Sequence, residues 1–180
     1  MEKMNDLRSL LKHDIVMLQS AEEQIVDALP TMVTRATNTD LKQGLQEHLL
    51  QTERHVQRLE QVSERLGADD DSVKRYSGVL ANLMGGTKCQ GMDGLIDEGK
   101  KLMAENLDDE VMDAAIIGAC QKIEHFEIAA YGTARAYAEQ LGMTDVAQLL
   151  QQTLDEEYTA DQKLTSLAVS CVNLKAEMSS

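Results

Sequence analysis

A long stretch without proline, residues 107–141, constrains the fold more than any other part of the chain. Its apolar residues recur every three or four positions, which predicts one face of an α-helix that packs on a core. Glu127 lies in the middle of that apolar face, and Glu124 lies one turn before it on nearly the same side. A carboxylate that is buried between apolar neighbours must be protonated, paired or bound to a cation. The sequence therefore predicts that other helices bring partners to these two residues.

Three further stretches have the same helical periodicity and predict long helices. They are residues 5–36, 40–66 and 145–172. Pro30 is expected to bend the first of these helices or to end it early. Residues 38–40 are expected to form a cap and a turn, and Gly67 is expected to end the second helix. The last six residues, 175–180, are expected to form a frayed tail.

Residues 67–106 are less regular, with a charged segment at 68–71 and short helices expected at 80–84 and 92–103. If the first two long helices form one antiparallel pair and the last two another, this stretch must be a long crossover. A ferritin-like bundle contains one such crossover. We therefore predict one all-α domain over residues 1–180. It is a ferritin-like antiparallel four-helix bundle with a long helical crossover between its second and third helices.

Each of the four predicted helices carries polar residues in the middle of its apolar face. The candidate metal ligands are Glu22, His48, Glu124, Glu127 and Glu157, and a second group of candidates is Gln51, Glu156 and Asp161. Antiparallel packing brings the middle sections of the helices to one level, where several carboxylates without water would repel one another. A pair of divalent cations removes that repulsion. Carboxylates with imidazole suit iron or manganese, and carboxylates alone also suit calcium or magnesium.

Simpler explanations exist for each residue taken alone. A single glutamate in an apolar face is usually at the edge of the helix with its carboxylate in solvent. The pattern typical of di-iron bundles, two glutamates plus two Glu-x-x-His motifs, is not present in clean form. His48-x-x-Gln51 reverses the order and lacks the acid, and Glu124-x-x-Glu127 has an acid in place of the histidine.

Other polar residues are given less direct roles. His125 and Glu156 are expected to face solvent or to hydrogen-bond to the ligands, and His13 and His55 are expected at the surface. Cys120 is expected to be a small core residue.

The composition excludes several classes of partner. The formal net charge is −14, from 31 acidic and 17 basic residues, so neither nucleic acid nor an anionic membrane is an expected partner. No apolar run approaches the roughly 18 residues that a membrane span needs. The three cysteines are too few and too scattered for a disulfide framework and suit a reducing compartment. No secretory signal is visible at the N-terminus, so a cytoplasmic location is expected.

Several segments together resemble the YciE/YciF-type bacterial ferritin-like proteins. They are residues 20–30, 48–53, 88–99, 124–132 and 154–157. The resemblance covers nearly the whole chain and implies a four-helix ferritin-like domain, often dimeric, linked to stress responses and without an established reaction. The five candidate ligands match the inward polar positions of that family. Gln51 departs from it, because an acid is expected there. The segment Lys88–Gly94 also matches, and packing of the crossover is its expected role.

Two functions of different classes follow from these observations. The first is a protein with one or two iron or manganese ions that protects the cell by reducing oxygen or peroxide, with a homodimer as the expected assembly. Whether it catalyses any reaction is left open. The second is a metal-free dimeric interaction protein whose carboxylates share protons or pair with His48. Iron storage in a shell is a weaker third interpretation.

Overall fold

The computed structural model describes residues 5–67 and 88–178. Their elements are α1 (Leu7–Arg35), α2 (Thr39–Arg65), α5 (Gln90–Ala104), α6 (Asp109–Gln140), α7 (Thr144–Leu167), a π-helical turn (Ala168–Val172) and α8 (Asn173–Met178). Within these ranges no residue is in a β-strand, so the all-α prediction is confirmed there. The helix expected at 92–103 is part of α5. The charged segment at 68–71 and the helix expected at 80–84 lie outside the described residues.

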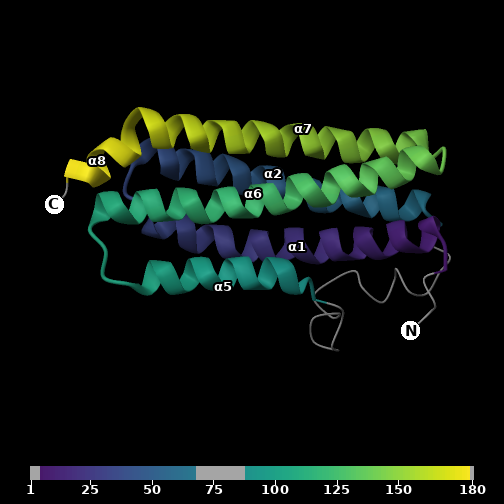
Figure 1. Cartoon of the computed structure of the whole chain (residues 1–180), viewed down its shortest axis with the longest axis horizontal. Coiled ribbons are helices and arrows are strands. Elements are labelled where there is room, and N and C mark those ends of the chain that lie inside the picture. Colours follow the sequence, from purple (N-terminus) through teal and green to yellow (C-terminus); the bar gives the residue numbers. More distant parts are fainter. Residues whose placement is uncertain (1–4, 68–87, 179–180) are drawn as a thin grey trace.

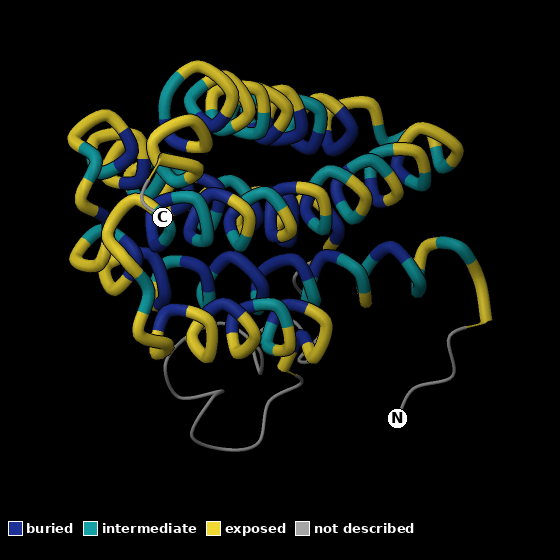
Figure 2. The backbone as a smooth tube through the Cα atoms, turned by 60° about the vertical axis from the view of Figure 1, so that its left-hand side comes forward, coloured by how far each residue is buried: buried dark blue, intermediate teal, exposed yellow. Residues whose placement is uncertain are grey.

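Four long helices, α1, α2, α6 and α7, lie side by side along the length of the molecule (Figure 1). The chain reverses between α1 and α2 and again between α6 and α7, so each pair is antiparallel. The shorter helix α5 packs against α1 and α6 on one side of this bundle. Buried residues line the inward faces of the long helices, and exposed residues line their outer faces (Figure 2). This is the arrangement of a ferritin-like bundle with a crossover between α2 and α6.

Local signals explain most of the helix ends. Asp6 accepts a hydrogen bond from the backbone N–H of Ser9 at 2.7 Å and caps α1. The Asn38 side chain accepts from two backbone N–H groups at 3.0 Å each and caps α2, as predicted. Gly67 has φ +92°, which favours glycine, and it follows the last turn of α2. The bundle therefore has the turns that its sequence predicts at these places.

The helix α1 continues through Pro30 to Arg35, so the expectation of an early end is wrong. Leu29 and Met32 are buried on the two sides of the proline and hold this part of the helix on the core. Packing therefore outweighs the loss of one backbone hydrogen bond. The expectation of a frayed tail from residue 175 is also wrong as far as Met178, because α8 extends to that residue.

The crossover segment is fastened to α1 and α6. The Cys89 backbone N–H donates to Ser20 Oγ at 3.0 Å, and Gln24 Nε2 donates to the Cys89 carbonyl at 3.3 Å. Gly91 lies so close to the Phe126 ring that a Cβ at this position would be 2.8 Å from it. The expectation that residues 88–94 pack the crossover is therefore confirmed.

The buried carboxylate of Asp113 connects α6 to the turn between α1 and α2. It accepts hydrogen bonds from the backbone N–H groups of Thr37 and Asn38, both at 2.8 Å, and from Thr37 Oγ1 at 2.7 Å. These bonds fix α6 along the axis of the α1–α2 pair, which sets the level at which its glutamates meet the other helices. No helix in the described parts combines the length and the apolar character that a membrane span needs.

Candidate metal centre

Polar side chains from all four long helices meet in the interior of the bundle. Glu22 comes from α1, His48 and His55 from α2, Glu124 and Glu127 from α6, and Glu157 from α7. Five of the six are buried, and the sixth, His48, has a side chain that is 11% exposed. Two apolar clusters enclose this polar layer, one from each end of the bundle. The four glutamates predicted as ligands are thus brought together.

The first half of the cluster consists of Glu22, His55 and Glu157, which we call the closed half. His55 Nδ1 lies 2.8 Å from Glu157 Oε1 and 3.4 Å from Glu22 Oε1. The other ring nitrogen, Nε2, lies 2.7 Å from Glu156 Oε2. All three residues of the closed half are 0% exposed, so bulk solvent does not reach their charges.

The burial of His55 overturns the expectation that it is a surface residue. Both His55 and Val56 have the spacing that continues the apolar face between Thr52 and Leu59, and hydrophobicity alone favours Val56 for the inward position. The structure places His55 inward at 0% exposure and leaves Val56 half-buried. The reason is chemical, because carboxylates from α1 and α7 surround the imidazole and compensate its loss of water.

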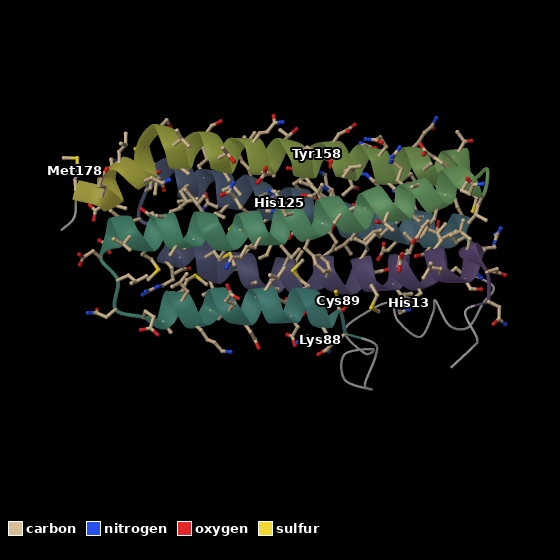
Figure 3. The ribbon with its side chains drawn as sticks, viewed as in Figure 1. His13, Lys88, Cys89, His125, Tyr158 and Met178 are labelled. Atoms are coloured by element: carbon tan, nitrogen blue, oxygen red, sulfur yellow. The ribbon has the colours of Figure 1, made fainter. Side chains whose placement is uncertain are left out.

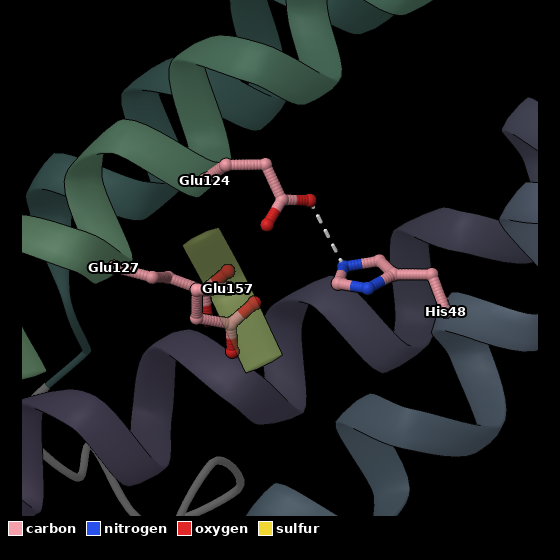
Figure 4. Close-up of side chains that lie close together, drawn as sticks. All are labelled: His48, Glu124, Glu127 and Glu157. Carbon is pink, nitrogen blue, oxygen red and sulfur yellow. Dashed lines mark ion pairs between the residues drawn. The ribbon is translucent and has the colours of Figure 1, made fainter. Parts of the chain in front are cut away.

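The second half consists of His48, Glu124 and Glu127 together with Glu157, and we call it the open half (Figure 4). His48 Nε2 lies 3.2 Å from Glu124 Oε1. One ligand atom from each of the four residues can be chosen so that all of these atoms lie within 4.8 Å of one another. Glu157 belongs to both halves, and its two oxygens can therefore serve two neighbouring positions.

Many of the potential ligand atoms in this cluster lack a hydrogen bond. Among the described residues, eight buried side-chain nitrogen and oxygen atoms make none, and all but the Nε of Arg135 belong to the cluster. Two of these atoms, His55 Nδ1 and Glu157 Oε1, nevertheless lie 2.8 Å apart as an ion pair. The other five are Glu22 Oε2, His48 Nδ1, Glu124 Oε2, Glu127 Oε1 and Glu157 Oε2. Buried polar atoms normally have a hydrogen-bond partner, so several unpaired carboxylate oxygens and an unpaired imidazole nitrogen in one place indicate a missing partner. Converging carboxylate and imidazole donors fit a divalent cation.

The electrostatics of the cluster agree with this interpretation. Burial, together with the charges of neighbouring carboxylates, raises the pKa of Glu124 and Glu127 well above the usual range for a glutamate. Burial likewise raises the pKa of Glu22, although His55 opposes it. Burial lowers the pKa of the His55 imidazole, but Glu157 and Glu22 outweigh it and raise that pKa to about 10. A protonated His55 is therefore the cation of the metal-free cluster.

The closed half is supported by a ring of further contacts. The buried Tyr131 hydroxyl donates a hydrogen bond to Glu22 Oε1. Arg58 Nη1 lies 3.0 Å from Glu156 Oε2 and also donates to Thr153 Oγ1 at 2.5 Å. Glu156 thus connects the buried His55 to a partly exposed guanidinium. Such contacts orient the ligands of metal sites and keep them in one rotamer.

The remaining candidates lie outside the cluster. Glu156 hydrogen-bonds to His55, which was one of the roles expected for it. Asp161, 20% exposed, accepts from Gln121 Nε2 at 3.2 Å and lies 3.4 Å from His125 Nε2. Gln51 lines a cavity beside His48 and Glu124.

The other expected locations are confirmed. His13 and His125 are exposed on the outside of the bundle (Figure 3), and Cys120 is buried in the core.

Two incomplete motifs stand where di-iron bundles have complete Glu-x-x-His motifs. Thr52-x-x-His55 has the histidine of a Glu-x-x-His motif but not its acid, and Glu157-x-x-Ala160 has the acid but not its histidine. His48, two turns before His55, supplies an imidazole to the open half from α2 instead. The spacing of seven residues between the two histidines was the available signal, because it places both on one face of a helix.

The chain matches the family model "Domain of unknown function (DUF892)" over residues 6–85 and 79–177. It is 38% identical to Protein YciF of Escherichia coli (strain K12) over 174 residues, and this alignment covers 97% of each of the two chains. The solved structure of the E. coli stress protein YciF superposes with a TM-score of 0.83 at 36% identity, covering 94% of this chain and 99% of that one. These matches confirm the resemblance to YciE/YciF-type proteins.

Two further solved structures have the same fold. YcfI of Rhodopseudomonas palustris superposes with a TM-score of 0.80 at 39% identity, covering 91% of this chain and 96% of that one. A protein of Xanthomonas campestris pv. campestris is 19% identical with a TM-score of 0.65, covering 96% of this chain and 98% of that one. At that identity the likeness shows the fold alone.

Proposed function

Because this chain belongs to the DUF892 family, whose E. coli relative YciF is a stress protein, we propose a related protective role that depends on metal. The protein binds two divalent iron or manganese ions at the centre of the bundle. In this assignment the closed half, Glu22, His55 and Glu157, holds one ion. His48, Glu124 and Glu127 hold the second ion together with Glu157.

One observation supports this proposal, the concentration in one cluster of buried ligand atoms that make no hydrogen bond. Seven of the eight such atoms in the described residues belong to the six proposed ligands, and five of them remain when the ion pair of His55 Nδ1 with Glu157 Oε1 is set aside. Burial, and after it the repulsion between carboxylates, raises the pKa values of Glu124 and Glu127, and two divalent ions would balance the charge of the four carboxylates. Two imidazoles among the donors favour iron or manganese over calcium and magnesium, which prefer oxygen ligands.

The surrounding residues have defined tasks in this proposal. A bound iron or manganese pair would supply the electrons that reduce oxygen or peroxide. Tyr131 holds the Glu22 carboxylate through its hydroxyl hydrogen bond, and Glu156, fixed by Arg58, orients the His55 ring. The apolar clusters at both ends keep bulk water out of the closed half.

Anaerobic titration of the metal-free protein with ferrous iron tests the proposal. We expect two equivalents of ferrous iron to bind. We also expect oxygen or peroxide to oxidise the bound iron, measured by ferric absorption, faster than it oxidises free ferrous iron. The Glu127→Gln variant should lose this reaction, whereas Glu53→Gln, an exposed position on α2, should keep it. Less than one equivalent of bound iron, or equal rates with and without protein, contradicts the proposal.

The histidines favour a second candidate, a metal-free stress-associated interaction protein. A protonated His55 between Glu22 and Glu157 already provides one positive charge, and His48 contacts Glu124. In that case a chelator leaves the melting temperature unchanged, whereas the metal-binding function requires it to fall. The homodimer and the cytoplasmic location stay predictions. Size-exclusion chromatography tests the dimer and also separates it from a storage shell.

A further inference from the structure

A cavity of about 340 Å³ lies between α2 and α7 and reaches His48 and Glu124. Exposed residues of both helices line its outer part, and the buried residues Cys120 and Glu124 of α6 line it as well. His48 is the only one of the six cluster residues that is not buried. The cavity therefore connects solvent with the open half of the cluster.

Small residues on the two facing helices create the cavity. Gly44 lies one turn before His48 on α2, and a Cβ at this position would meet no atom within 4 Å. Across the gap, Ala160 lies one turn after Glu157 on α7, at the position where a Glu-x-x-His motif would carry the histidine. The small size of these two residues leaves the open half accessible from the side of the bundle.

The cavity is large enough for a metal ion together with its water shell. A divalent ion with six water molecules occupies roughly 180 Å³, since the share of liquid volume of one water is about 30 Å³. The ion can therefore enter while it is still hydrated. It has to lose its waters only at the inner end, where ligands of the protein replace them.

The charges around the cavity favour a cation. Asp40 and Glu47 are exposed on its α2 side, and Lys163 is the one lysine or arginine among the described residues that line it. The net charge of −14 adds a field that attracts cations. At the inner end, Glu124 Oε2 and His48 Nδ1 are buried and have no hydrogen-bond partner among the described residues. The path thus runs from exposed carboxylates to unpaired ligand atoms.

We propose that this cavity is the route by which divalent metal ions enter the cluster. Asp40 and Glu47 attract the hydrated ion, and Glu124 and His48 are the first ligands that it meets. The closed half is filled through the open half, because its own three residues are fully buried. The route rests on the proposed function, since it serves the same ions. A route sets one barrier for entry and release, so closing it slows both equally and leaves the affinity unchanged.

Stopped-flow mixing of the metal-free protein with cobalt(II), whose visible absorption changes on binding, measures the rate of uptake, and an excess of chelator measures the rate of release. Gly44→Leu adds a side chain where a Cβ meets no atom and replaces a helix-interior glycine by a better helix former. Uptake and release should both slow about tenfold, with two ions still bound at the affinity of the parent.

Gly118→Leu is the matched control. This glycine is exposed on α6, does not line the cavity, and likewise has no atom within 4 Å of a Cβ. Neither rate should change in this variant. Uptake of two cobalt ions at the parent's rate by Gly44→Leu overturns the route and leaves the metal site standing. Weaker binding with faster release in Gly44→Leu also overturns it, because that result shows damage to the ligands instead of a closed path.

Charge variants test the outer part of the route. Asp40→Asn combined with Glu47→Gln should slow uptake about three- to tenfold at low ionic strength, and the difference from the parent should shrink as salt screens the charges. Lys163→Met should speed uptake about twofold. Uptake by the double variant at the parent's rate in low salt overturns the attraction by the two carboxylates. A parent protein that binds no cobalt contradicts the proposed function and the route together, so the two failures are distinguishable.

Discussion

The two halves of the polar cluster share Glu157 but differ in how the protein holds them. The closed half is fully buried, and the contacts of Tyr131 and Glu156 fix its ligands from outside. The open half contains the ion pair of His48 with Glu124 and borders the cavity between α2 and α7. We therefore expect the closed position to hold an ion rigidly and the open position to be able to exchange a ligand.

The largest effect is expected from Glu157→Gln, because this residue belongs to both halves. Gln retains the size of the side chain but removes the charge that both ions share, so the bound metal should fall from two ions per chain to about none. Elemental analysis after reloading with manganese measures it, with Glu53→Gln as the control. Retention of one full equivalent would show that the two halves do not depend on a shared carboxylate.

Glu22→Gln and Glu124→Gln separate the halves, since each residue belongs to only one of them. Each variant should retain about one ion per chain, because the other half keeps its own ligands and Glu157. The remaining ion should bind more tightly in Glu124→Gln, where the supported closed half is intact. Competition with a chelator measures the metal affinity of the two variants, which can then be compared. Equal affinities in the two variants would contradict the distinction.

The metal-free protein should lose stability as the pH rises. The folded pKa values of Glu124 and Glu127 lie above their unfolded values. Protonation of these two residues therefore stabilises the fold fully below about pH 4, and this stabilisation is lost as the pH rises through their folded pKa values. Protonated His55 contributes stability below its unfolded pKa, about 6.5, which is lost as the pH passes its folded pKa, about 10. Each group contributes a slope of up to about 1.4 kcal/mol per pH unit in the interval where it titrates.

Metal should reverse this dependence, because the ions displace protons from the same ligands and bind more tightly at higher pH. Thermal unfolding of both forms between about pH 6 and pH 8 measures the effect. A double variant, Glu124→Gln with Glu127→Gln, serves as the control and should give a shallower slope without metal. A metal-free protein that becomes more stable over this interval would contradict the electrostatic account.

The smallest effect is expected from Arg58→Gln, which acts only on the support of the closed half. Loss of the guanidinium releases Glu156 and loosens the His55 ring, without removing any ligand. Removal of such supporting contacts lowers metal affinity about 10- to 100-fold, and we expect the lower end because Glu156 is partly exposed. An unchanged manganese affinity would show that these contacts do not organise the site.

The fold could be predicted because helical periodicity is a local property of the sequence. Four long apolar faces and one irregular stretch were enough to predict the bundle and its crossover. The sequence alone could not decide between a bend and an early end at Pro30, because the burial of Leu29 and Met32 on the core is a tertiary effect. The tail was also predicted wrongly as far as Met178, since α8 reaches that residue although none of its residues is buried.

Part of the site could be predicted because helical periodicity also shows which polar residues interrupt an apolar face. Glu22, Glu127 and Glu157 interrupt apolar faces, so the sequence alone indicated that they point inward. His55 competed with Val56 for one inward position, and hydrophobicity favoured the valine. The carboxylates that reverse this preference come from α1 and α7, far away in the sequence. The cavity depends on Gly44 and Ala160, which face each other only after folding.

Anomalous scattering at the manganese absorption edge from crystals of the loaded protein tests the central claim most directly. The account predicts two peaks in the bundle interior. One should lie among Glu22, His55 and Glu157, and the other among His48, Glu124 and Glu127, with Glu157 reaching both. Fully loaded crystals with no peak at this cluster, or with manganese only at the surface, would contradict it.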